Sequence, residues 1–464
     1  MSDCKKLKEE LFYENKNGFL RADEQEIKTV FDFCEGYKQF LNLAKTEREA
    51  AQTAISLAKQ KGFEAFSFDK KYAPGDKVYF DNRGKAVAFV VFGEEPAAKG
   101  VNITAAHIDS PRLDLKPNPL YEDTELALFK THYYGGIKKY QWTTVPFSLH
   151  GVFAKKDGSV IQVSIGERPD EPQFVVNDLL PHLAKEQDKR TCGEGIKGEE
   201  LNVLVGSRPF KDDEGSELVK LNILKLLNEK YGITEEDFLS AELEMVPVAK
   251  ATDIGFDRAL VGAYGQDDRV CAYGALAAIL ETEKPRRTAV TILADKEEIG
   301  SDGNTGLNSC FLSHVIHDVC LNDGSDETVA LRNSNCLSAD VNAAMDPTFP
   351  DVIEKKNASF LNHGVVVTKY TGHGGKYSTN DASAEYLARI RALLDDAGII
   401  WQTGELGKVD IGGGGTVAKY IANLGVDVVD LGVAVLSMHA PFEVTAKLDV
   451  YMCKRAMYEF MKDF

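Results

Sequence analysis

Several features are missing from this 464-residue sequence. It has no run of ~18 apolar residues, which is what a membrane-spanning helix needs. Its start, Met1 to Gly18, is polar and charged, and it has neither the apolar stretch nor the cleavage site of a secretory signal. We therefore predict a cytoplasmic protein that has no membrane partner.

Positive charge and paired cysteines are also scarce. The chain has 54 Lys and Arg against 72 Asp and Glu, a formal net charge of −18. Binding to a phosphate backbone requires a basic face, so we predict no nucleic-acid partner. The eight cysteines form no C-x-x-C pair. In a long chain without a secretory signal, such cysteines are expected to be reduced and mostly buried.

Two common hydrolase motifs are absent. No G-x-S-x-G occurs, which argues against a serine hydrolase of the α/β type, and no H-E-x-x-H occurs, which argues against a single-zinc protease. The run Gly412 to Gly415 lacks the Lys-Ser/Thr ending of a phosphate-binding loop. These glycines are better explained as letting the backbone approach a substrate or metal closely.

The pattern of the chain changes twice along its length. A length well above ~250–300 residues predicts two domains. Helical spacing covers residues 25–61, and a hairpin turning at 82–84 follows. Residues 115–254 alternate like half-buried strands, with 185–213 expected to be an exposed loop. Strands then alternate with helices. We predict an α/β protein whose three-layer αβα domain, residues 1–114 plus 255–464, is interrupted by an inserted β-rich domain, 115–254.

Four segments place acidic or histidine side chains at or near the end of an apolar run. Such groups meet in the crevice beyond the carboxyl ends of the strands of an open α/β sheet, so we expect them to converge. The segments are VNITAAHIDSP with His107 and Asp109, TAVTILADKEEIGS with Asp295, Glu297 and Glu298, NCLSADVNAAMDP with Asp340, and DLGVAVLSMHAPFE with His439.

Two histidines and several carboxylates form a ligand set suited to zinc or a similar divalent ion. Two ions sharing a bridging carboxylate would account for five protein ligands and a water. The candidate bridge is Asp267 in GAYGQDDRVCAYG, directly before a predicted helix. Because that position also suits a helix N-cap, a capping role for Asp267 or Asp268 remains an alternative.

At this point the residues carry a family resemblance. AHIDSP, GQDDR, DKEEIGS, SAD and SMHAPFE resemble, in order, the metal-site motifs of the M18 aminopeptidases. THYYGG, GERP, LLPHLA and KYSTNDASAEY extend the similarity over most of the chain. The resemblance implies a zinc-peptidase αβα catalytic domain with an inserted β-rich dimerisation domain, and it implies homo-oligomers, commonly dodecamers built from dimers.

The resemblance also implies roles for individual residues. It assigns His107 and Asp340 to one zinc, Glu298 and His439 to the other, and Asp267 to both. Glu297 occupies the position of the family's general base. Asp109 would orient the His107 imidazole from behind, as carboxylates commonly do for ligating histidines.

Further residues match family motifs less specifically. His182 in LLPHLA corresponds to a histidine that reaches the neighbouring subunit's active site, and a purely structural histidine is the alternative. Lys369 corresponds to a lysine near the substrate side-chain pocket, where it would favour acidic residues; an exposed lysine at a strand end is the alternative. His373, between glycines, is expected to be either a turn residue or a mobile ligand or pocket residue.

The sequence therefore predicts a dinuclear zinc aminopeptidase that removes the N-terminal residue from peptides, with acidic residues as one candidate preference. Cobalt or manganese could replace zinc with these ligands. A two-metal deacylase or carboxypeptidase on the same scaffold is the rival enzyme. A non-catalytic oligomeric assembly protein is the rival from another class, although the whole ligand set and Glu297 are intact.

Overall fold

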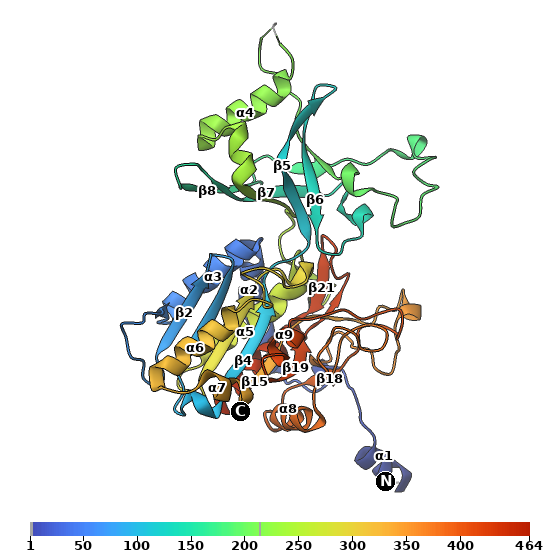
Figure 1. Ribbon diagram of the computed structural model, residues 1–464. Coiled ribbons are helices and arrows are strands. Elements are labelled where there is room, and N and C mark those ends of the chain that lie inside the picture. The colour runs from blue at the N-terminus through green and yellow to red at the C-terminus, as the bar shows by residue number, and fades with distance from the viewer. Residues whose placement is uncertain (1–2, 213–214) are drawn as a thin grey trace.

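The computed structural model describes residues 3–212 and 215–464 (Figure 1). Its largest sheet has nine strands, and the four in the middle, β14, β4, β15 and β19, run parallel to one another. Their carboxyl ends therefore share one edge of the sheet. In sheet order the strands are β1 (Glu64–Ala65), β2 (Lys77–Asn82), β3 (Ala86–Val91), β14 (Ala289–Ala294), β4 (Asn102–His107), β15 (Asn335–Ser338), β19 (Asp427–Gly432), β17 (Val365–Thr368) and β18 (Trp401–Thr403).

Helices cover both faces of this sheet, because its central strands are apolar on both sides. Along β3, Val87 and Phe89 enter one core cluster, whereas Ala88 and Val90 enter the other. The predicted three-layer α/β fold is confirmed. The first face packs α2 (Glu24–Leu43), α3 (Glu47–Gln60), α5 (Gln266–Glu281), α8 (Ala384–Asp396) and α10 (Lys447–Asp463); the second packs α6 (Phe311–Asp323), α7 (Glu327–Arg332) and α9 (Ala418–Ala422).

A second, antiparallel sheet lies above the first in Figure 1. The pairing of β11 with β7 closes six of its seven strands into a ring around a separate apolar core. In sheet order the strands are β11 (Ala241–Pro247), β5 (Arg112–Asp123), β6 (Leu126–Tyr134), β10 (Asn202–Gly206), β9 (Phe174–Val176), β7 (Pro146–Ala154) and β8 (Val160–Ile165). This sheet is the β-rich part expected from the sequence.

Two elements of this region differ from expectation. The stretch 185–213 is not a loop throughout: β10 lies within it, pairs with both β6 and β9, and buries Val203. Residue 213 lies outside the described residues. The helix α4 (Leu218–Tyr231) was not predicted, and its N-cap residue, Glu217, makes no capping hydrogen bond with its side chain. The usual start signal of a helix is therefore missing.

A small third sheet flanks the site described below. The apolar run of residues 425–435 predicts one strand, but the structure divides it: β19 ends at Gly432, and β20 joins the third sheet. In sheet order its strands are β12 (Thr252–Ile254), β13 (Leu260–Ala263), β21 (Glu443–Ala446), β20 (Ala434–Leu436) and β16 (Asn342–Ala343).

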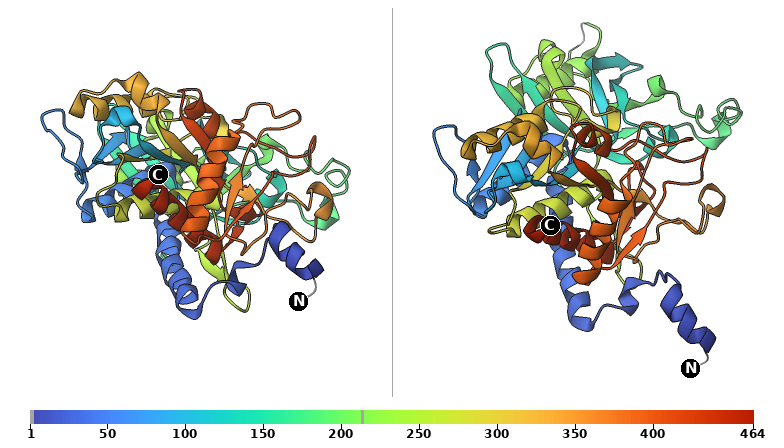
Figure 2. Two further views of the ribbon diagram at one scale, coloured as in Figure 1. Left: turned by 90° about the horizontal axis from the view of Figure 1, so that it is seen from below. Right: turned by 60° about the horizontal axis from the view of Figure 1, so that its bottom comes forward.

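The N-terminal helix α1 (Asp3–Leu11) projects away from the rest of the molecule in every view (Figures 1 and 2). Among the described residues, no helix combines the length and apolar character that crossing a bilayer requires.

Candidate metal centre

The predicted side chains gather at the carboxyl edge of the main sheet. His107 is the last residue of β4, and Asp340 follows the end of β15 by two residues. Glu297 and Glu298 begin the short 3-10 helix η7 (Glu297–Ile299), three residues after β14 ends. Because β14, β4 and β15 are neighbours and parallel, their ends deliver these four side chains to one place.

Asp267 joins the two histidines. One carboxylate oxygen, Oδ1, lies 3.2 Å from His107 Nε2, and the other, Oδ2, lies 3.1 Å from His439 Nε2. His439 reaches this point from the loop between β20 and β21, not from a strand of the main sheet. Each oxygen thus has its own histidine partner, which is the arrangement expected of a carboxylate shared between two cations.

The remaining carboxylates divide between the two histidines. Asp340 Oδ1 lies 3.7 Å from His107 Nε2, and Glu298 Oε2 lies 3.4 Å from His439 Nε2. Glu298 Oε1 is buried and has no hydrogen-bond partner within the described chain. A buried carboxylate oxygen without a partner is costly unless a cation satisfies it. The donor set, two imidazoles and several carboxylates, therefore fits zinc.

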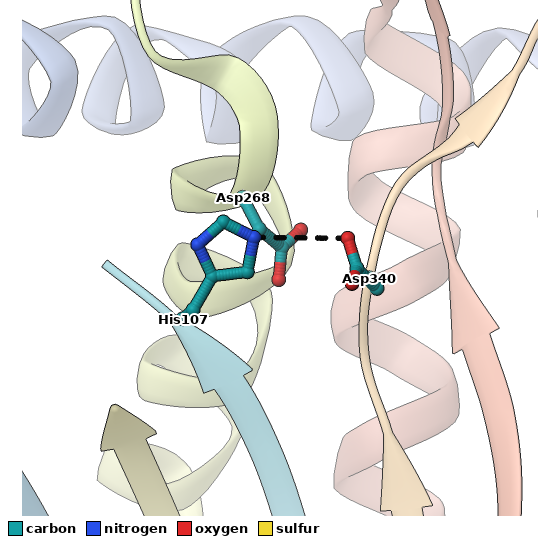
Figure 3. A group of neighbouring side chains, drawn as sticks. All are labelled: His107, Asp268 and Asp340. Carbon is teal, nitrogen blue, oxygen red and sulfur yellow. Dashed lines mark ion pairs between the residues drawn. The ribbon is translucent and has the colours of Figure 1, made fainter. Parts of the chain in front are cut away.

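Asp268 also faces this cluster, and in the view of Figure 3 its carboxylate lies between the His107 ring and Asp340. His107, Asp268 and Asp340 each offer an atom within 4.8 Å of the others, as do His107, Asp267 and Glu298. Both oxygens of Asp268 are buried and have no hydrogen-bond partner in the described structure. From the sequence, we considered only a capping role for Asp268. Its position next to the acidic Asp267 was the feature that could have indicated a metal ligand.

Asp109 supports the cluster by contacting the ring nitrogen of His107 that does not face Asp267. It is fully buried, and its Oδ1 lies 3.3 Å from His107 Nδ1. It also accepts hydrogen bonds from the backbone N–H groups of Glu297 (3.1 Å) and Glu298 (3.2 Å) and from the Tyr134 hydroxyl (2.8 Å). One carboxylate thus ties together the His107 ring, the η7 segment and strand β6. This supports the orienting role expected of Asp109.

Glu443, which the sequence reasoning missed, holds two further parts of the centre in place. It is 1% exposed. Its Oε2 accepts from the backbone N–H groups of Gln266 (2.6 Å) and Asp267 (3.2 Å), and its Oε1 accepts from that of His439 (2.8 Å). The backbones that carry the bridge and the second histidine therefore converge on one carboxylate. Its place four residues after His439 in SMHAPFE was the signal.

The close approach of several carboxylates shifts the pKa values of the groups in this cluster. Burial, followed by the charge of Asp340, raises the pKa of Glu297 to about 8. Burial, followed by Asp267, raises the pKa of Glu298 well above its ordinary value. Burial opposes charge on His439, but Asp267 and Glu298 still raise its pKa to about 11. The cluster therefore holds protons that a divalent cation would displace.

The centre opens into a cavity of about 490 Å³. Its lining includes Asp267, Glu297, Glu298, Asp340 and His439 at one end. The glycines 413–415 form part of the wall, in agreement with the expected close approach of backbone, and His373 lines it as a pocket residue.

Two predicted residues lie elsewhere in this single chain. His182 sits exposed in the 3-10 helix η4 (Pro181–Leu183), and Lys369 pairs with Asp381. Neither is among the described residues that line the cavity.

Comparison with known proteins places this chain in a family. Residues 40–461 match the family model described as aminopeptidase I zinc metalloprotease (M18). The chain is 48% identical over 462 residues to a probable M18 family aminopeptidase 1 of Clostridium acetobutylicum, covering 98% of this chain and 99% of that protein. The crystal structure of an M18-family aminopeptidase from Thermotoga maritima matches with a TM-score of 0.93 at 46% identity, over 98% of this chain and 100% of that one.

The Saccharomyces cerevisiae mApe1 dodecamer is more distant, at 22% identity, and shows the shared fold alone, with a TM-score of 0.73 over 93% of this chain and 96% of that chain. The family model and the bacterial relative each cover most of the sequence, so the likeness is not confined to one domain. The chain belongs to the M18 family of zinc aminopeptidases and is a hydrolase that removes N-terminal residues from peptides.

Proposed function

We propose that the centre holds two zinc ions. His107 and Asp340 would bind one, Glu298 and His439 the other, and Asp267 would bridge them. The observation that carries this proposal is the position of Asp267, whose two oxygens lie 3.2 and 3.1 Å from the two different histidines. Metal analysis of the zinc-loaded protein tests it: we expect two ions per chain, and one ion at saturation would refute it.

The chain's own residues supply the acid–base chemistry. When bound, the two ions provide an activated water and polarise the scissile carbonyl. Glu297, which lines the cavity, would take a proton from the attacking water and return it to the leaving amine. Asp109 holds the His107 ring and the η7 backbone in fixed positions relative to each other.

An acidic preference at the first residue is the finer part of the proposal. Lys369 is the candidate from the sequence. Its ammonium already pairs with Asp381, which Lys376 also contacts at 2.9 Å. A substrate carboxylate would compete with Asp381 for Lys369. If Lys369 selects the substrate, Asp381→Asn should therefore strengthen the preference for Glu over Gln as first residue, and an unchanged preference would remove Lys369 from the site.

A substrate with a blocked α-amine distinguishes an aminopeptidase from the rival deacylase or carboxypeptidase. Zinc-loaded protein is incubated with a free dipeptide and with its N-acetylated form. We expect cleavage of the free dipeptide alone, since an aminopeptidase requires the α-amine. Equal cleavage of the blocked peptide would favour a deacylase or carboxypeptidase, and no cleavage of either would favour a non-catalytic assembly protein.

Assembly and location complete the proposal. We propose a cytoplasmic homo-oligomer, a dodecamer built from dimers, supported by the shared fold with a relative solved as a dodecamer. The exposed position of His182 is compatible with its acting in a neighbouring subunit's site. Sedimentation of the zinc-loaded protein tests the assembly. Mixing chains carrying His182→Ala with chains carrying Glu297→Gln tests the exchange, because hybrid assemblies should regain activity.

A further inference from the structure

The cavity that contains the metal centre is strongly acidic. Five of its lining residues carry carboxylates, and among the described lining residues the only lysine or arginine is Lys419. Lys419 is therefore the cationic side chain of this lining that can select an anionic group on a ligand by charge pairing. The carboxylates are Asp267, Glu297, Glu298, Asp340 and Asp430.

The ammonium of Lys419 is not neutralised by the protein. In the described part of the chain, no carboxylate pairs with it, and its recorded contact is the ring of Tyr420, 4.7 Å from Nζ to the centroid. The side chain is half-buried. Lys369 and Lys376 differ, because both are paired with Asp381. Lys419 therefore retains a charge that a bound molecule can use.

Lys419 stands beside the segment that carries the proposed general base. It belongs to α9, and the hydroxyl of the next residue, Tyr420, donates a hydrogen bond of 2.7 Å to the carbonyl oxygen of Gly300. Gly300 directly follows η7, which begins at Glu297. The wall formed by α9 is thus fixed to the segment that delivers a proton to the leaving amine. Because the leaving amine belongs to the part of the peptide beyond the scissile bond, that part would lie on the side of Glu297.

We propose that Lys419 binds a carboxylate of the peptide beyond the scissile bond. The inference rests on the proposed function, because it assumes that Glu297 serves the leaving amine. The carboxylate can be the C-terminus of a dipeptide or the side chain of an acidic second residue, and both have the same chemistry. The substrate class is therefore short peptides that carry negative charge next to the bond being cleaved, independent of the charge on the first residue.

Three pairs of peptides, each differing in one carboxylate, test the proposal with the zinc-loaded full chain. Ala-Ala against Ala-Ala-amide tests the C-terminus, Ala-Glu-amide against Ala-Gln-amide tests the second side chain, and Glu-Ala-amide against Gln-Ala-amide tests the first. We expect the charged member of the first or second pair to have a higher kcat/KM, mainly through KM. An effect of about twofold to fivefold is expected for a solvent-screened ion pair, and added salt should reduce it.

Four variants assign that preference to a side chain. Lys419→Met and Lys419→Gln should abolish it, Lys419→Arg should retain it, and the matched control Lys376→Met, at a lysine paired with Asp381, should retain it. The proposal is overturned if the wild-type protein shows no preference in the first two pairs, or if both neutral variants keep it. A wild-type protein that cleaves none of the six peptides would instead overturn the proposed function, so the two failures are distinguishable.

Discussion

The hydrogen bonds of Glu443 allow a sharp test of how the metal centre is held. The three groups that face its carboxylate, the backbone N–H groups of Gln266, Asp267 and His439, are all donors. A glutamine has the same size but only one acceptor oxygen. Whichever way its amide turns, the NH₂ group faces at least one of these donors. Glu443→Gln therefore leaves a buried N–H unsatisfied.

The expected free-energy cost follows from the number of N–H donors left without an acceptor. An unsatisfied buried donor costs about 1–3 kcal/mol. Part of this cost falls on zinc binding, because the displaced backbone carries Asp267 or His439. We expect zinc affinity to fall about tenfold to a hundredfold, the usual effect of removing a group that supports metal ligands. Burial and Asp267 raise the pKa of Glu443 to about 8, so affinity is best measured above that pH, where the carboxyl is ionised.

The chain offers a matched control whose hydrogen-bond partners do not line the cavity of the metal centre. Asp449, in α10, is a fully buried carboxylate that accepts from the backbone N–H groups of Asn362 (2.9 Å) and Gly364 (2.7 Å). Asp449→Asn should lower the unfolding temperature of the metal-free protein but leave zinc affinity unchanged. Both variants are measured by competition with a chelator and by thermal unfolding in chelator. If Glu443→Gln binds zinc as tightly as the wild type, the supporting role of Glu443 is wrong.

Three further predictions address the centre itself. Glu297→Gln should retain its zinc content but lose at least ~100-fold in kcat, because only the proton carrier is removed; a fully active variant would exclude Glu297 as the base. Zinc binding should tighten as pH rises and should release protons, because the raised pKa values of Glu298 and His439 mean that both hold protons that zinc must displace. Calorimetry in buffers of different ionisation enthalpy measures the number of protons released. A zinc affinity that does not depend on pH would contradict this prediction. Asp268→Asn should weaken zinc binding if Asp268 ligates the ion at His107, and unchanged affinity and stoichiometry would show that it does not.

Much of the fold could be predicted from local patterns. The helical spacing of residues 25–61, the apolar runs that end at His107 and Ala294, and the alternation in the inserted region are visible in the sequence because burial sets their periods. The helix α4 and the strand β10 could not be predicted in the same way. The start of α4 lacks a capping side chain, and β10 is stabilised by its neighbours β6 and β9, which the local sequence does not contain.

For the site, the sequence by itself determined the chemistry: which residues can bind a divalent cation and which carboxyl stands ready to carry a proton. Only the tertiary structure decided how they meet. It placed Asp267 between two histidines that are 332 positions apart, brought His439 in from the loop that joins two strands of the third sheet, and added Glu443 as a support. It also distinguished two lysines: Lys419 lines the cavity, whereas Lys369 pairs with Asp381. The reason is physical: residue type fixes what a side chain can bind, whereas partners and distances depend on backbone packing between segments remote in sequence.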